Sequence, residues 1–73
     1  MTDGIEWAWW LENIEVYRDG PEGQFSCDAW VRDDAFHKLG AYTYVGWGDT
    51  VTGAIQEAIA AGNARAQEVK GDE

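Results

Sequence analysis

The spacing of apolar residues changes at Gly46-Trp47-Gly48-Asp49-Thr50, and this change constrains the fold more than any other feature of the sequence. Before it, apolar side chains tend to alternate with polar or small ones, which is the period of a strand with one buried face. After it, they recur every three or four residues, as on one face of a helix. The helical stripe comprises Val51, Ile55, Ala58, Ile59, Gly62, Ala66 and Val69. We therefore expect strands before this segment and a helix over about 50–69 after it, capped by Asp49 or Thr50.

The first strand-like run covers about residues 5–18, and its alternation slips near the middle. Trp7 and Trp9 share one face, whereas Trp10 takes the other. The apolar residues after the slip are Ile14 and Val16. A β-bulge within residues 10–13 would return them to the face of Trp7 and Trp9. We therefore expect Trp7 and Trp9 to face the core and Trp10 to face the opposite side. A register shift of one residue would exchange these roles.

Two further strand-like runs follow, over about residues 24–32 and 38–47. Asp19-Gly20-Pro21-Glu22-Gly23 indicates a hairpin before the first of them, and Asp33-Asp34 opens a turn before the second. Alternation assigns a core-facing set: Phe25, Cys27, Ala29, Val31, Leu39, Ala41, Thr43, Val45 and Trp47. The order β-β-β-α predicts an α+β fold in one domain over residues 1–73. We expect a three-stranded antiparallel meander with a C-terminal helix packed on one face and the other face open. Gly62, on the helical stripe, is expected to allow a close approach to the sheet.

The charge of the chain limits its possible partners. Its 73 residues include 14 acidic and five basic side chains, a formal net charge of −9. Direct binding of nucleic acid or of an anionic membrane needs a basic surface, so both are disfavoured. A basic protein partner is favoured, because opposite fields steer association. The sequence has no long apolar run and one cysteine, which cannot form an internal disulfide. These features predict a soluble protein of the cytoplasm.

The sequence contains few residues in patterns typical of catalysis or metal binding. The chain has no Ser-His-Asp order and no Cys-His pair at useful spacing, and Cys27 with His37 cannot complete a zinc site. Cys27 falls on the apolar face of the second strand and is expected to be a small core residue. We therefore expect no catalytic residue, no cofactor and no metal, and a protein that is not an enzyme.

The open face of the expected sheet is the more informative feature. The predicted partner-binding residues are the rings of Trp10, Trp30, Tyr42 and Tyr44 and the carboxylates of Glu6, Glu12, Asp28, Asp33 and Asp34. Carboxylates would repel the phosphates of a nucleic acid, whereas an arginine can stack on a ring and pair with a carboxylate at the same time. This pattern favours a basic protein surface as the partner. Two alternatives stay open: a homodimer formed through this face, and a surface with no partner.

Two resemblances point in the same direction. The segment Val45–Gly62 resembles the passage from the third strand to the helix in HicB-type antitoxins, at Gly48, Asp49, Thr50, Ala54 and Ala58-Ile59. It implies a module that neutralises a basic RNA-binding toxin. In size, acidity and expected architecture the chain is also similar to phage-encoded anti-CRISPR proteins, several of which imitate DNA. This second resemblance implies a non-enzymatic inhibitor that blocks target recognition by a CRISPR effector complex, with its carboxylates in the place of phosphates.

Overall fold

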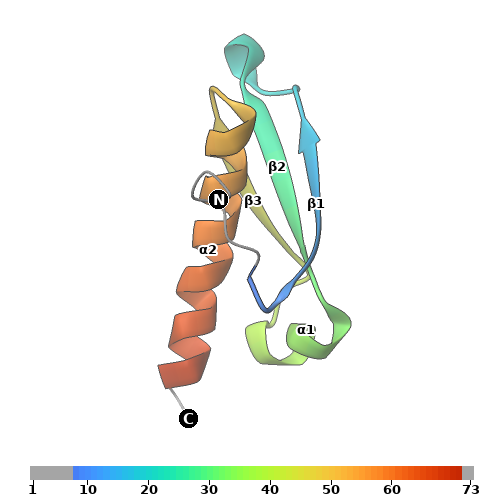
Figure 1. The fold of residues 1–73 in the computed structure, drawn as a ribbon, viewed down its shortest axis with the longest axis vertical. Helices are drawn as coiled ribbons and strands as arrows, with labels where there is room; N and C mark the ends of the chain where they lie inside the picture. The colour runs from blue at the N-terminus through green and yellow to red at the C-terminus, as the bar shows by residue number, and fades with distance from the viewer. Residues whose placement is uncertain (1–7, 72–73) are drawn as a thin grey trace, which may run out of the picture.

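The computed structural model describes residues 8–71 and places a long helix across one face of a three-stranded sheet (Figure 1). The elements, in chain order, are β1 (Leu11–Tyr17), the 3₁₀ turn η1 (Pro21–Gly23), β2 (Phe25–Val31), α1 (Asp33–Leu39), β3 (Thr43–Gly48) and α2 (Val51–Gly71). The strands follow the order β1-β2-β3, and both pairings are antiparallel. The predicted α+β meander with a C-terminal helix is confirmed, and α1 is an addition to it. None of the helices within residues 8–71 has the length and apolar character needed to cross a membrane.

Glycines in β3 set how closely α2 approaches the sheet. A Cβ at Gly46 would overlap the backbone of Ala54 and Ala58, and a Cβ at Gly48 would overlap the backbone of Ala54. Helix backbone therefore lies directly against this strand, and α2 packs chiefly on β3 and β2. The buried apolar residues are Trp10, Leu11, Cys27, Ala29, Val31, Ala35, Leu39, Ala54, Ala58, Ile59 and Ala66. The prediction that the helix covers the apolar face of β2 is confirmed, including a buried Cys27.

The predicted phase of the third strand is wrong. Alternation placed Thr43, Val45 and Trp47 toward the core, but Val45 and Trp47 are exposed on the face away from α2. The face toward α2 carries Tyr44 and Gly46 instead. Close helix packing needs the small residues on the inner side, and this requirement overrides the usual preference for burying the larger ones.

The predicted turn and strand start at residues 33–42 are also partly wrong, because this segment contains α1. Ala35 and Leu39 are spaced as i and i+4, and both are buried. Two acidic residues begin the helix and a His-Lys pair lies in its last turn, which complements the helix dipole. Gly40 ends α1 in the left-handed conformation, with φ of 75°, and its N–H donates to the carbonyl of Phe36.

The roles predicted for the tryptophans near the N-terminus are exchanged. Trp10 is fully buried, with 0% of its surface exposed, whereas 56% of Trp9 is exposed. Residues 9 and 10 form a turn before β1, closed by the Leu11 N–H donating to the Ala8 carbonyl (3.1 Å), so strand alternation does not apply to them. The predicted bulge is present, as a register shift between Leu11 and Asn13. Trp7 lies outside the described residues.

Helix α2 begins and packs much as predicted. The Thr50 side chain caps it by accepting from the Gly53 N–H (2.9 Å). Val51 is exposed, however, and the buried stripe begins at Ala54 rather than at Val51. Gly62 does allow a close approach, although to a ring rather than to the sheet. A Cβ at this position would overlap the six-membered ring of Trp10. The Trp10 indole N–H donates to Oδ1 of Asn63 (2.8 Å), which fixes the ring against α2.

Candidate functional site on the open face of the sheet

The face of the sheet that α2 leaves uncovered consists of three cross-strand rows. Pairing across β1, β2 and β3 gives, from the hairpin end, Tyr17–Ser26–Trp47, then Glu15–Asp28–Val45, then Asn13–Trp30–Thr43. The outer rows carry aromatic rings and the central row carries two carboxylates. Tyr17, Trp30, Val45 and Trp47 are all substantially exposed. We call these nine residues the open-face patch.

The central row places two like charges directly opposite each other. Glu15 on β1 pairs with Asp28 on β2, and directly opposite side chains in an antiparallel pair have Cβ atoms about 4.5–5.5 Å apart. The salt bridges within residues 8–71 are Arg32–Asp34 (3.2 Å) and Arg65–Glu68 (3.3 Å), so no basic side chain neutralises this pair. Like charges in this position destabilise a sheet, so this pair lowers the stability of the free protein.

Hydrogen bonds hold Glu15 in place within the open-face patch. The Trp30 indole N–H donates to Oε1 of Glu15 at 2.8 Å. A side-chain hydrogen bond with Glu15 is also the largest cause of the raised pKa of Tyr17; smaller contributions come from desolvation and from the charges of Glu15, Asp28 and Asp19. Aromatic residues therefore lie in the rows on both sides of this carboxylate, and the bond from Trp30 orients it.

The row nearest the hairpin, Tyr17–Ser26–Trp47, is more closely packed than the other two rows of the open-face patch. A Cβ at Gly20 would lie 3.0 Å from Cζ3 of Trp47, so this ring reaches from β3 across to the hairpin. Ser26, the cross-strand partner of Trp47, is buried, and its hydroxyl donates to Oδ1 of Asp19 (2.6 Å). The Trp47 ring thus contacts the hairpin at Gly20, although much of the residue is open to solvent.

The structure separates the predicted partner-binding residues. Asp28 and Trp30 belong to the open-face patch, and Glu12 is exposed at the adjoining bulge. The placement of Trp10 and Tyr44 on this face is wrong. Trp10 lies in the core and the partly buried Tyr44 packs against it, with their rings edge to face and their centroids 5.5 Å apart. They cannot contact a partner on the open face because the sheet lies between.

The remaining predicted residues lie away from the centre of the open-face patch. Tyr42 is exposed, but it precedes β3 and stacks on Phe36 of α1, with centroids 3.9 Å apart. Asp33 and Asp34 are exposed in the first turn of α1, where a turn leading into the third strand had been predicted. Glu6 lies outside the described residues.

Only Asp28 and Trp30 of the nine residues in the open-face patch were among the predicted partner-binding residues. The missed residues with a charged or large side chain are Glu15, Tyr17, Val45 and Trp47. The signal for Glu15 and Tyr17 was present, because residues after the bulge alternate regularly and these two oppose Ile14 and Val16. Val45 and Trp47 were missed together with the phase of β3. Their signal was the pair of glycines at 46 and 48, which share the other face.

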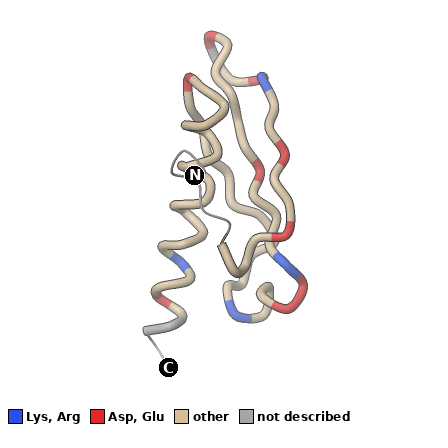
Figure 2. Tube along the Cα trace, viewed as in Figure 1, with Lys and Arg blue, Asp and Glu red and all other residues tan. Residues whose placement is uncertain are grey.

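Acidic residues are distributed unevenly over the fold. Figure 2 shows acidic positions from the hairpin tip, along β1 and β2, to the start of α1. Residues 11–34 contain seven acidic and two basic side chains, whereas α2 contains two of each. The excess negative charge of residues 8–71 is thus concentrated on the β1–β2 side, which includes the open-face patch.

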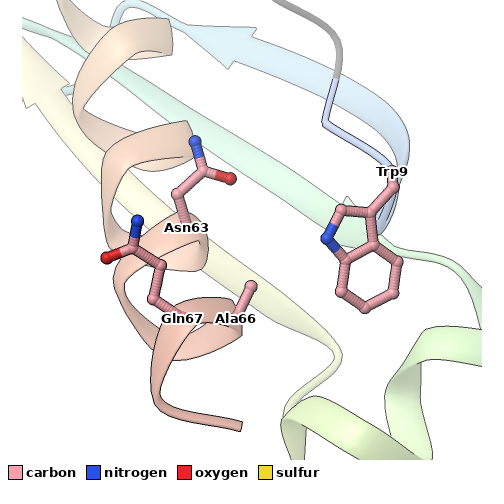
Figure 3. Close-up of a pocket in the computed structure, with 4 residues that line it drawn as sticks. All are labelled: Trp9, Asn63, Ala66 and Gln67. Atoms are coloured by element: carbon pink, nitrogen blue, oxygen red, sulfur yellow. The ribbon is translucent and has the colours of Figure 1, made fainter. Parts of the chain in front are cut away.

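A shallow pocket lies on the other side of the molecule, between the N-terminal turn and α2 (Figure 3). It has a volume of about 280 Å³ and is lined by Trp9, Asn63, Ala66 and Gln67. The Trp9 ring is met by the Lys38 ammonium, 5.8 Å from the ring centroid. Oδ1 of Asn63 is already occupied by Trp10. The pocket therefore presents one ring and two amides, with no charged group lining it.

Comparison with known proteins yields no relative from which a function could be transferred. No protein-family model, no curated protein and no solved structure matches the chain. Within residues 8–71, no group of three or more His, Cys, Asp or Glu side chains is placed to hold a metal ion. The candidate site accordingly stands on its own geometry: two opposed carboxylates, no basic partner, and aromatic rings on either side.

Proposed function

We propose that this protein is a non-enzymatic inhibitor whose open-face patch binds a basic, nucleic-acid-binding surface of another protein. The observation that carries the proposal is the direct opposition of Glu15 and Asp28 without a basic neighbour. Such a pair is unfavourable in the free protein and becomes favourable when a cation lies between the two carboxylates. A bound cationic side chain would therefore remove the repulsion between the two carboxylates and also be attracted to both of them.

Arginine is the side chain that fits the open-face patch best. A planar guanidinium has donors on several edges, so it can bond to both carboxylates while its face lies against an aromatic ring. The Trp30 and Trp47 rings lie in the rows on either side of the carboxylates and are available for such stacking. A lysine ammonium would gain the charge attraction but would lack the planar fork.

The form of inhibition that we propose is competition with nucleic acid. The acidic positions along β1, β2 and α1 would extend the contact beyond the central pair, with Glu12, Asp33 and Asp34 meeting further basic residues of the target. Nucleic-acid-binding sites are rich in lysine and arginine, and a protein that occupies them excludes phosphates. A CRISPR effector complex, acting in the cytoplasm, is the target class that we propose. A basic RNA-binding toxin is the alternative, tested by the same titration with such a toxin and fluorescent RNA in place of the effector complex and its DNA.

Displacement of DNA tests the proposal. A purified CRISPR effector complex is loaded with fluorescent target duplex, and the protein is titrated in at several salt concentrations. We expect displacement that weakens as salt rises, since screening reduces the attraction. We also expect loss of displacement in the double variant Glu15→Gln with Asp28→Asn. The matched control is Asp49→Asn with Glu68→Gln, which changes the net charge equally at exposed positions outside the open-face patch.

Three results bear on the proposal in different ways. Equal loss in both double variants would mean that net charge alone matters, and would refute the role of the open-face patch. Binding that is insensitive to salt would refute the electrostatic mechanism. If a basic RNA-binding toxin is bound and the effector complex is not, the target class is wrong, although the site stands.

A further inference from the structure

The central row of the open-face patch combines an apolar side chain with two carboxylates. Val45 on β3 pairs with Asp28 on β2, which pairs in turn with Glu15 on β1. Val45 is 47% exposed, whereas both acidic residues are half-buried. Neighbouring strands lie about 4.7–4.9 Å apart, so this row spans about 10 Å across the sheet. It therefore matches a long side chain that is apolar along its stem and charged at its end.

The two carboxylates of the central row differ in their hydrogen bonds. Glu15 accepts from the Trp30 indole N–H through Oε1 (2.8 Å). The Asp28 carboxylate accepts no hydrogen bond within residues 8–71. An ionised carboxylate has about four acceptor sites on its two oxygens. Asp28 therefore offers both oxygens to a ligand, and Glu15 offers further acceptor sites on a carboxylate that Trp30 orients.

The Trp30 ring leans toward the central row. Its Cα lies in the next row, two residues beyond Asp28 on the same face of β2, yet its indole N–H reaches Glu15 on β1. The Trp47 ring leans the other way, toward the hairpin at Gly20. The aromatic surface nearest to the two carboxylates therefore belongs to Trp30, and 39% of this residue is exposed.

We propose that the central row binds one unmodified arginine side chain of the partner, and that methylation of this arginine weakens binding; the inference rests on the proposed function. The arginine lies across the strands with its methylene groups on Val45. Its guanidinium donates two parallel hydrogen bonds to Asp28 and a third to Glu15, with one face against the Trp30 ring. Charge complementarity selects a cation, and acceptors on two carboxylates select the planar guanidinium, with five donors, over an ammonium.

Methylation of the arginine distinguishes this arrangement from an aromatic cage. Methyl groups on the terminal nitrogens keep the positive charge but remove donors that the two carboxylates require. Aromatic cages favour methylated cations, because they attract the charge without needing its hydrogen bonds. A preference for unmodified arginine would therefore show that the carboxylates, rather than the rings alone, recognise the ligand.

Trp30 also acts as a positioning residue for Glu15. Trp30→Phe keeps an aromatic face but removes the N–H that orients the carboxylate. We expect this variant to weaken arginine binding by about three- to tenfold and lysine binding by less, because an ammonium is less demanding of acceptor geometry. A purely structural role would weaken both alike. Trp47→Phe is the matched control, since the Trp47 indole N–H has no acceptor within residues 8–71, and it should leave the ratio of the two affinities unchanged.

Four short peptides test the proposal by NMR titration of the native chain. They are otherwise uncharged and identical, with arginine, asymmetric dimethylarginine, lysine or citrulline at one central position. We expect the dissociation constant to rise about three- to tenfold from arginine to dimethylarginine and to lysine. Citrulline keeps the shape of arginine without its charge, and should not bind. The Trp30 indole and Val45 methyl signals should shift most with the arginine peptide.

Tighter binding of dimethylarginine than of arginine would overturn the inference, and so would equal binding of arginine and lysine. It would also be overturned if the arginine peptide shifts neither Trp30 nor Val45 at saturating concentration. The inference and the proposed function can fail separately. Displacement of DNA from the effector complex reports on the proposed function, whereas the ratios of the peptide dissociation constants report on the arginine site.

Discussion

The contact between Gly62 and the Trp10 ring makes a sharp prediction about stability. Replacement of a helical glycine by alanine normally stabilises a protein by about 1 kcal/mol through helix propensity. At this position the new Cβ would overlap the six-membered ring of Trp10, which is fully buried and held by its hydrogen bond to Asn63. The ring would have to move, so Gly62→Ala is expected to destabilise the fold instead.

The magnitude follows from the balance of three effects. Overpacking of a core costs about 1–3 kcal/mol, and loss of the indole hydrogen bond adds about 0.5–1.5 kcal/mol if the ring rotates away. The helix propensity gained by alanine offsets about 1 kcal/mol. We therefore expect a net loss of about 1–3 kcal/mol from a chain of 73 residues, whose whole stability should be about 4–11 kcal/mol. The midpoint of thermal unfolding should fall by roughly 5–20 °C.

Urea unfolding followed by tryptophan fluorescence and circular dichroism measures this effect. Gly53→Ala is the control, because the same substitution in the same helix meets the Thr50 hydroxyl and no core ring. This hydroxyl caps α2 through the Gly53 N–H, so its displacement would cost at most about 1 kcal/mol, which the helix propensity of alanine offsets. Trp10→Phe should rescue part of the loss in the double variant, since the smaller ring leaves room for the new methyl group. If Gly62→Ala proves as stable as Gly53→Ala, the Trp10 ring does not lie where we place it.

Three further predictions follow from single contacts. Tyr44→Phe should raise stability or leave it unchanged, because the buried Tyr44 hydroxyl has no hydrogen-bond partner in the described chain. Burial raises the pKa of Tyr44 above 10.0, so above pH 10 this residue ionises more readily in the unfolded chain than in the folded one. Its ionisation therefore leaves the free energy of unfolding unchanged below pH 10 and lowers it at higher pH. Urea midpoints should fall more steeply above pH 10 in the native chain than in Tyr44→Phe. Thr50→Ala should cost about 1 kcal/mol in thermal unfolding, through loss of the cap on α2. Asp28→Asn should stabilise the free protein by a few tenths of a kcal/mol at low salt and by less at high salt, because it removes the repulsion from Glu15; no gain at low salt would show that the opposed carboxylates do not repel.

Strand order and the long helix were predictable because the periods of β2 and α2 are clear over seven or more residues. The alternation of β2 correctly identified Cys27, Ala29 and Val31 as buried, and Thr50 is one of the two residues predicted as the cap of α2. The bulge could be predicted because the apolar phase before and after it differs. Each of these signals is local, so no knowledge of the tertiary packing was needed.

The phases of β3 and of the N-terminal turn were not predictable from alternation. Gly46 faces α2 because two backbones meet there, a reason that lies in another element of the fold. Trp10 is buried because residues 9 and 10 leave the strand and turn toward Gly62, more than fifty residues along the chain. Helix α1 has seven residues, too few for its period to stand out from a turn followed by a strand. The candidate site changed with these corrections, from a face bearing Trp10 and Tyr44 to one bearing Glu15 and Trp47.

The tryptophan indoles offer the most direct test of where a basic partner binds. Each indole N–H gives a separate NMR signal: Trp30 and Trp47 report on the open-face patch, Trp9 on the pocket beside α2, and Trp10 on the core. An arginine-rich peptide is titrated into the ¹⁵N-labelled protein, with a lysine-rich peptide of equal charge for comparison. We expect the arginine-rich peptide to shift the Trp30 and Trp47 signals, with the Trp30 shift largest because its N–H bonds to Glu15, while Trp9 and Trp10 stay unchanged. Shifts at Trp9 alone, or none at Trp30 and Trp47 under saturating peptide, would contradict the central claim that the uncovered face of the sheet is the binding surface.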